Sequence, residues 1–279
     1  MNHDKTILSV FATLLILGAI FFVIERLLGR GSGRAQPVFR KGFGTDVVYW
    51  FTTILLAKPV VRTLFILPLG VLVLAKLTPV DVLKLGEYRG FGPLSQQPVW
   101  LQAIEIYVLV DFFTYWTHRL FHRSRMWPFH AVHHSSEDLD WLGALRVHPV
   151  NDFVNKLMQA SPLLLVGFNP LVTLSTAPFL TSYAIFLHAN VNWDFGPLRR
   201  IIATPVFHRW HHSRDREAWD KNFAGLFPFW DILFGTYYMP RGRFPENFGI
   251  CEPMPKSYLG QLWEPFAWLG RRGRKVDPV

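Results

Sequence analysis

The stretch His130-Ala-Val-His133-His134 lies near the middle of a 279-residue chain, two residues after Pro128, and proline fits near a helix start. Its spacing returns at His208-Arg-Trp-His211-His212, and a related pair, His118-Arg-Leu-Phe-His122, stands shortly before it. In chain order these stretches are called box 1 (118–122), box 2 (130–134) and box 3 (208–212). Residues three or four apart share one face of a helix, so each box predicts a short helix with its imidazoles on one side.

The number of imidazoles predicts metal binding. Ten of the eleven histidines lie between positions 118 and 212, so chance clustering explains them poorly. A lone pair of histidines often only hydrogen-bonds its surroundings, but eight in three boxes favour a metal site. Eight or nine nitrogen ligands exceed the four of a closed zinc site, so we expect two ions.

The other residues limit the chemistry. A single cysteine, Cys251, excludes an intramolecular disulfide, a cysteine-ligated iron–sulfur cluster and a cysteine-rich zinc site. Neither a His-Glu-x-x-His motif nor a Gly-x-Ser-x-Gly motif is present. Among the metals that suit imidazole, only iron and copper would be redox-active and activate oxygen. A membrane zinc hydrolase and a histidine-rich metal transporter remain the alternatives.

The composition favours a membrane protein. Half of the residues are hydrophobic and only 18% are charged, which is low for a soluble enzyme. Ile7 to Ile24 is a run of 18 residues without a charge, long enough to cross the hydrocarbon core as a helix with its flanks. A signal peptide is the competing interpretation, but the apolar run is too long and no convincing cleavage site follows. We expect a retained membrane anchor.

Three further apolar blocks predict more membrane helices, at residues 47–75, 99–116 and 157–187. The first is interrupted by Lys58, so it is either one kinked helix or a re-entrant pair. The third is broken near Gly167, which predicts a helical hairpin. The sequence therefore favours an all-α, polytopic membrane protein of about four spans or half-spans.

Basic residues beside the apolar blocks suggest an orientation. The positive-inside rule places residues 29–44 in the cytoplasm and, if the 47–75 block crosses once, the boxes as well. Lys84 and Arg89 would then lie outside, against the rule, and a re-entrant block would reverse the next span. The formal charge of +9 has no accompanying nucleic-acid motif, so we expect no nucleic-acid partner.

Together the boxes resemble those of the fatty acid hydroxylase/sterol desaturase superfamily. The similarity extends to four more stretches: Asp111-Phe-Phe-Thr-Tyr-Trp-Thr-His118-Arg, Arg146-Val-His148-Pro149, His188-Ala-Asn-Val-Asn192-Trp and Trp230-Asp-Ile-Leu-Phe-Gly-Thr236. It covers about residues 105–240. The resemblance implies a membrane stem of helices capped by a cytosolic helical domain, with two irons that use O2 and two electrons to attack an unactivated C–H bond. The product is an alcohol or an alkene, and ligand spacing does not decide between them.

The resemblance also implies the ligands. Nine histidines would bind the irons: His118, His122, His130, His133, His134, His188, His208, His211 and His212. Asn192, four residues after His188, would reach a metal through water or order the residues around the ligands.

Four more residues are candidates around the ligands. Asp111 lies two helical turns before His118 and either accepts the second N–H of a ligating imidazole or pairs with an arginine, Arg119 or Arg146. Asp231 and Asp194 have the same two interpretations. His148 either orients a ligand, binds substrate or is structural, and is not counted as a ligand.

The resemblance implies partners as well. The substrate would be a membrane lipid, open among acyl chains, sterols or hopanoids, carotenoids, ether lipids and ornithine-type headgroups. Because no nucleotide-binding glycine motif, cysteine cluster or haem domain is visible, we expect an external electron donor, a ferredoxin or a b-type cytochrome with its reductase. Basic residues near the boxes would dock this donor, bind a lipid phosphate or only snorkel to the membrane surface. These are Arg119, Arg123, Arg125, Arg199, Arg200, Arg209 and Arg214.

We expect residues 1–279 to form a single membrane-embedded domain, with N-terminal membrane helices (1–97), a catalytic region (98–240) and a C-terminal tail (241–279). The compact chain suggests a bacterial inner membrane with the boxes on the cytoplasmic side, and the oligomeric state is open.

Overall fold

The computed structural model describes residues 3–28, 36–57, 70, 73–76, 89–123 and 125–271. Most of the predicted block beyond residue 57 therefore lies outside the described residues, as do Lys58, Lys84, residues 29–35 of the predicted cytoplasmic loop and the tail from residue 272. Within the described residues all regular structure is helical, and an isolated bridge between Ser213 and Phe248 is the only β-type pairing. The prediction of an all-α fold is confirmed for this part of the chain.

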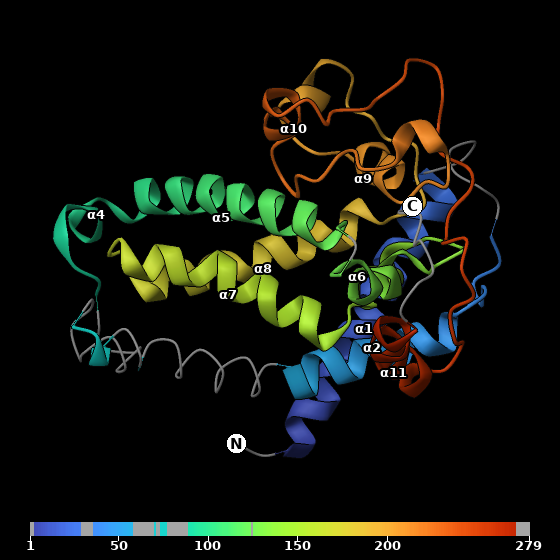
Figure 1. Cartoon of the computed structure of the whole chain (residues 1–279), viewed down its shortest axis with the longest axis horizontal. Coiled ribbons are helices and arrows are strands. Elements are labelled where there is room, and N and C mark those ends of the chain that lie inside the picture. The colour runs from blue at the N-terminus through green and yellow to red at the C-terminus, as the bar shows by residue number, and fades with distance from the viewer. Residues whose placement is uncertain are drawn as a thin grey trace.

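Three long helices form a stem. They are α5 (Val99–Phe121), α7 (Pro149–Leu165) and α8 (Pro170–Leu187), and they run alongside one another in Figure 1. Ile106, Leu163 and Phe168 are buried among them and form the core of the stem. At 1.5 Å per residue, α5 is about 34 Å long. This length carries its C-terminal end, with box 1, to one end of the stem.

The predicted hairpin between positions 157 and 187 is present as α7 and α8. Gly167 has a positive φ of 98°, which favours glycine, and the Asn169 side chain accepts the N–H of Leu171 at 2.9 Å to start α8. The first helix begins earlier than the apolar block, at Pro149, because the His148 side chain caps it and its first two turns are polar. The apolar pattern therefore predicted the hairpin correctly but not the polar first two turns of α7.

The N-terminal helices pack against the same unit. α1 (His3–Phe22) continues into a π-helical segment, η1 (Val23–Leu28), and α2 (Phe43–Thr52) into η2 (Thr53–Ala57). Val10 and Phe21 of α1 pack with Trp50 and with Trp141, stacking Phe21 on Trp141 at 5.3 Å between ring centroids. The predicted anchor is thus a helix with one face on the protein and with exposed apolar residues elsewhere.

Short helices gather at one end of the stem and form a cap (Figure 1). In chain order they are α6 (Trp127–His134), η4 (Trp141–Leu145), η5 (Gly196–Arg200), α9 (Pro205–His211), η6 (Arg216–Ala218), α10 (Phe229–Leu233) and α11 (Tyr258–Gly270). A small helix at the other end, α4 (Gly92–Gln96), leads into α5.

Two of the described helices are long and apolar enough to cross a membrane, at residues 6–27 and Pro170–Leu187. A shorter apolar helix covers Phe43–Leu56. The block at 99–116 forms a helix of sufficient length, but it is less apolar than these two because Gln102, Glu105 and Asp111 lower its hydropathy.

Candidate metal centre

The nine histidines meet in two groups at the junction of stem and cap. The first, the five-histidine group, contains His118, His122, His130, His134 and His211. The second, the four-histidine group, contains His133, His188, His208 and His212. Each histidine offers one ring nitrogen to its group, and within a group these nitrogens all lie within 4.8 Å of one another. The structure therefore brings together every histidine named as a candidate ligand and leaves His148 outside both groups.

The boxes divide between the groups in a crossed pattern. From box 2, His130 and His134 enter the five-histidine group and His133 enters the other. Box 3 does the reverse: His208 and His212 enter the four-histidine group and His211 enters the five-histidine group. Residues four apart lie above one another on a helix while the residue at i+3 is turned to the side, so each short helix serves both groups.

Helix starts hold boxes 2 and 3 in place. Proline occupies the first or second position of both α6 and α9. A backbone N–H at these positions would have no acceptor within the helix, so proline, which lacks the N–H, costs no hydrogen bond there. The Thr204 hydroxyl accepts the N–H of Phe207 at 3.1 Å and caps α9. His118 and His188 come instead from the ends of α5 and α8.

The outward-facing ring nitrogens are tied to oxygen acceptors. His118 Nδ1 donates to the carbonyl of Phe223 at 2.8 Å, and His133 Nδ1 to the carbonyl of Arg146 at 3.1 Å. His188 and His211 do the same to the carbonyls of Ala184 (2.7 Å) and Lys221 (2.8 Å). Because a carbonyl only accepts, the hydrogen of these neutral rings is on Nδ1 and the Nε2 lone pair points inward.

Inside each group, lone pairs face one another. His133 Nε2 lies 3.2 Å from His188 Nε2, although both rings carry their hydrogen on Nδ1. Neither nitrogen then has a proton to donate to the other, so the pair needs a cation between them. Two nitrogens that each lie about 2.1 Å from one ion are about 3.0–3.4 Å apart when the nitrogen–metal–nitrogen angle is between its octahedral and tetrahedral values. The donor set and its spacing therefore fit a metal ion.

Protonation is a poor substitute for a metal here. The imidazoles of boxes 2 and 3 are buried, and burial lowers the pKa of His130, His133, His134, His208, His211 and His212 well below the ordinary value. Neighbouring imidazoles lower these pKa values further, because a second positive charge nearby is unfavourable. The neutral form that binds metal is thus the form that burial favours.

Asp111 supports the site differently from either prediction. Its carboxylate accepts the backbone N–H groups of Gly225, Leu226 and Phe227 at 2.7–2.8 Å, rather than an imidazole or an arginine. Three backbone donors turn inward there, and the two carboxyl oxygens of Asp111 satisfy all of them. Asp111 thereby fixes the loop whose Phe223 carbonyl holds His118.

Asp231 holds the same loop from the other side. It accepts the N–H of Phe223 (2.8 Å) and of Ala224 (2.9 Å) and the hydroxyl of Thr236 (2.6 Å), so the prediction of an imidazole or arginine partner is wrong for this residue too. Asp194 does pair with an arginine, Arg199, at 3.1 Å.

The remaining candidates lie around the cluster. His148 is structural: its Nδ1 accepts the N–H of Val150 and its Nε2 donates to the carbonyl of Leu262, both at 3.1 Å. The side-chain oxygen of Asn192 is buried and has no hydrogen-bond partner in the described structure. Direct or water-mediated contact of Asn192 with a metal stays a prediction.

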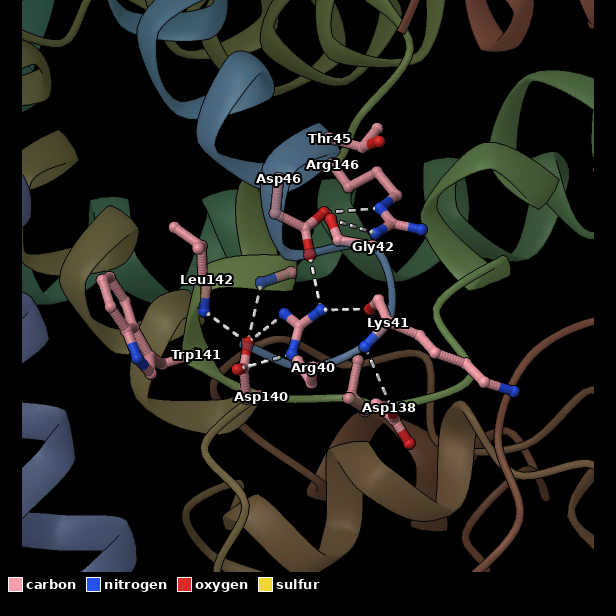
Figure 2. Close-up of polar contacts among 12 residues, drawn as sticks. Arg40, Lys41, Gly42, Thr45, Asp46, Asp138, Asp140, Trp141, Leu142 and Arg146 are labelled. Carbon is pink, nitrogen blue, oxygen red and sulfur yellow. Dashed lines mark hydrogen bonds and ion pairs between the residues drawn. The ribbon is translucent and has the colours of Figure 1, made fainter. Parts of the chain in front are cut away.

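A buried charge network connects the N-terminal region to box 2 (Figure 2). Asp46 of α2 lies 2.8 Å from Arg40 and 2.5 Å from Arg146, and Arg40 also binds Asp140. Asp140 in turn caps η4 by accepting the N–H of Leu142 at 3.0 Å. The backbone carbonyl of Arg146 is the acceptor for His133, so two arginines and two aspartates brace the four-histidine group.

Two polar residues of the site were missed from sequence. Asn151 lies on α7, and its side-chain oxygen is 2.7 Å from His130 Nδ1. Asp220 lies 3.3 Å from His122 Nδ1 in the loop after box 3. Asn151 lies two residues after Pro149 of the Arg146-Val-His-Pro stretch, but nothing in a single sequence shows that this turn of helix faces box 2.

One of the arginines predicted to dock an electron donor is not accessible to a partner. Arg209 is completely buried, with its guanidinium over the ring of Phe248 at 4.7 Å and one N–H donated to the carbonyl of Leu139 at 3.3 Å. It lies between two box 3 histidines on a helix whose whole surface is covered, so it cannot bind a partner protein.

Fold and site together define a class: a protein whose described regular structure is helical, with long apolar helices and nine largely buried histidines in two groups, each of which could hold a metal ion. Residues 103–236 match the family model described as fatty acid hydroxylase. The chain belongs to the fatty acid hydroxylase/sterol desaturase superfamily.

Several known proteins are similar to part of the chain, and the chain spans about half of the first relative's length and less of the others. The chain is 33% identical over 192 residues to an ornithine lipid hydroxylase of Rhizobium tropici, covering 68% of this chain and 57% of that protein. It is 38% identical over 169 residues to the alkylglycerol monooxygenase of Homo sapiens, covering 60% of this chain and 36% of the relative. A very-long-chain aldehyde decarbonylase of Oryza sativa is 27% identical over 140 residues, 46% of this chain and 21% of its own. No solved structure matches the chain.

Proposed function

We propose that this protein is an O2-dependent lipid hydroxylase that binds two iron ions with its nine clustered histidines. The main support for this proposal is that inward-facing Nε2 atoms converge in two separate groups, each of which offers a cation several imidazole ligands. Imidazole suits redox-active iron, and a pair of irons supplies the oxygen activation that amino acid side chains lack. The five-histidine group would hold one ion and the four-histidine group the other.

Hydroxylation rather than desaturation is supported by the activities for which two relatives are named, a lipid hydroxylase and a monooxygenase. The reaction breaks one C–H bond of the lipid and inserts one oxygen atom from O2. The second oxygen atom leaves as water, which consumes two electrons and two protons. We propose as substrate a polar membrane lipid, such as an ornithine lipid or an ether lipid.

The chain's own residues orient the ligands and exclude water. The carbonyls of Phe223 and Arg146 hold His118 and His133 in the orientation that turns their Nε2 atoms inward. Buried side chains around the histidines, among them Trp127 and Phe207, keep water from the site. A fixed, dry ligand set favours one arrangement of the ions and protects a reactive oxidant from side reactions.

Membrane topology is part of the proposal. The N-terminal helix, the N-terminal block that starts at 47, α5 and the α7–α8 hairpin would form about four spans or half-spans of a bacterial inner membrane, with the cap and the histidines on the cytoplasmic side. Electrons would come from an external ferredoxin or a b-type cytochrome. Arg123, Arg125 and Arg214 are exposed at the cap and would attract an acidic donor.

The decisive experiment measures metal and turnover on one sample. Protein purified without oxygen in detergent is analysed for metal by mass spectrometry, then given reductant, isotopically heavy O2 and a lipid extract. We expect about two irons per chain and a lipid that gains one heavy oxygen atom. Stoichiometric zinc that persists after iron reconstitution, with no oxygen uptake, would favour a hydrolase instead.

A further inference from the structure

Helix α11 packs on the back of box 2 through one face. Its N-terminus is capped by Ser257, whose hydroxyl accepts the N–H of Gly260 at 3.2 Å. Trp268 packs against the buried Trp127 and Ala131 of α6, and the carbonyl of Leu262 accepts the Nε2–H of His148, the residue that caps α7, at 3.1 Å. These contacts join α11 to α6, the helix that carries box 2, and to the start of α7.

The other face of α11 is apolar and uncovered. Leu259 is 74% exposed, Trp263 69%, Phe266 47% and Leu269 39%. Their spacing of four, three and three residues puts them on one side of the helix. A helix that is apolar on two opposite faces has a second apolar environment besides the protein core.

The orientation of α11 suggests what that environment is. Figure 1 shows the stem helices α5, α7 and α8 lying in the plane of the picture, whereas α11 is seen nearly end-on. α11 therefore lies across the stem axis. If the stem crosses a membrane, a helix across its axis at the cap end is parallel to the membrane surface.

Charge at the helix ends fits the same surface. Lys256 is exposed just before the helix, and Arg271 just after it is half exposed and pairs with Glu264 of α11. The sequence then continues with Arg272, Arg274 and Lys275. Apolar and tryptophan side chains flanked by basic residues are the composition of helices that lie in the headgroup region of anionic membranes.

We propose that α11 is an interfacial helix whose exposed face, formed by Leu259, Trp263, Phe266 and Leu269, inserts into the lipid surface beside the stem. Its partner is a membrane containing anionic phospholipids, whose phosphates pair with the basic residues at the helix ends. This role does not depend on iron or on oxygen chemistry. It also gives box 2 a fixed height above the membrane, because α6 packs against α11.

The test uses the full chain in lipid nanodiscs made of phosphatidylcholine and phosphatidylglycerol. Cys251 is the only cysteine, so a Cys251→Ser background allows a single nitroxide spin label to be attached at Trp263→Cys. Oxygen concentrates in lipid and a nickel chelate stays in water, so the ratio of their effects on label relaxation reports depth. Glu217→Cys is the matched control, because its side chain is 65% exposed on a short helix of the cap.

We expect the oxygen-to-nickel ratio to be several-fold higher at position 263 than at 217. Equal ratios would show that α11 lies in water and would overturn the proposal. Exclusion of both reagents from position 263 would mean that protein, either a second copy or a partner, covers the face, and would overturn it as well. If Trp263→Cys misfolds, Leu259→Cys gives the same comparison. None of these readouts uses turnover, so they stand apart from the test of the hydroxylase.

Discussion

Asp46→Asn tests whether the buried charge network supports the metal centre. In the native chain one carboxylate faces two guanidinium groups, 2.8 Å from Arg40 and 2.5 Å from Arg146, and the Asp46 and Arg40 side chains are completely buried. Asparagine has nearly the same shape but no charge, so one positive charge of the four-group network is left without compensation. Removing one partner of a buried ion pair costs about 3–5 kcal/mol.

The assay is chemical denaturation in detergent micelles, together with metal content per chain. We expect the free energy of unfolding to fall by about 3–5 kcal/mol. Metal loss should be selective, because the carbonyl of Arg146 holds His133 of the four-histidine group, and none of the hydrogen bonds described for Arg146 goes to the other group.

Asp152→Asn is the matched control. Asp152 forms an ion pair with Lys156 at 2.5 Å on the surface of α7, and both side chains are partly exposed. Such a pair contributes about 0.3–0.5 kcal/mol. If Asp46→Asn is as mild as this control and keeps its full metal load, the network does not support the site.

Three further changes probe the centre. His211→Ala removes one imidazole of the five-histidine group, so metal content should fall to roughly half, whereas a full load would show that His211 is no ligand. Asp111→Asn weakens three backbone hydrogen bonds to a charged acceptor and should cost about 1.5–3 kcal/mol on denaturation, and an unchanged value would contradict the loop-holding role. Burial lowers the pKa of residues such as His130 and His212, so the unfolded chain binds more protons than the folded one. Metal-free protein should therefore lose stability as the pH falls below about 6.5, and equal stability at pH 5 and 7 would refute this.

Sequence predicted the histidine centre well because its geometry is local. Spacings of three and four residues fix which imidazoles share a helix face, and this pattern is visible without any knowledge of the fold. His188 is different: it stands alone, and only the resemblance to the family pointed to it. The crossed division of boxes 2 and 3 between the two groups was not predicted, because it depends on how α6 and α9 face each other.

The residues around the ligands were harder to predict for the same reason. Asp111 lies on the expected helix turn, but its partners are backbone groups more than a hundred positions away. Arg40 and Asp46 lie outside the region that matches the family model, and their role appears only when α2 packs against η4. Periodicity identifies faces, but it does not identify the element that each face meets.

The crossed pattern of the boxes also affects how the protein is made. Each histidine group contains members from both box 2 and box 3, and the α7–α8 hairpin separates these boxes along the chain. The groups are complete only when His211 and His212 have left the ribosome and the hairpin has brought α9 back to α6. Under the proposed membrane topology, such a chain would acquire its metals only after membrane insertion, and a failure to insert the hairpin would leave both ion sites incomplete at once.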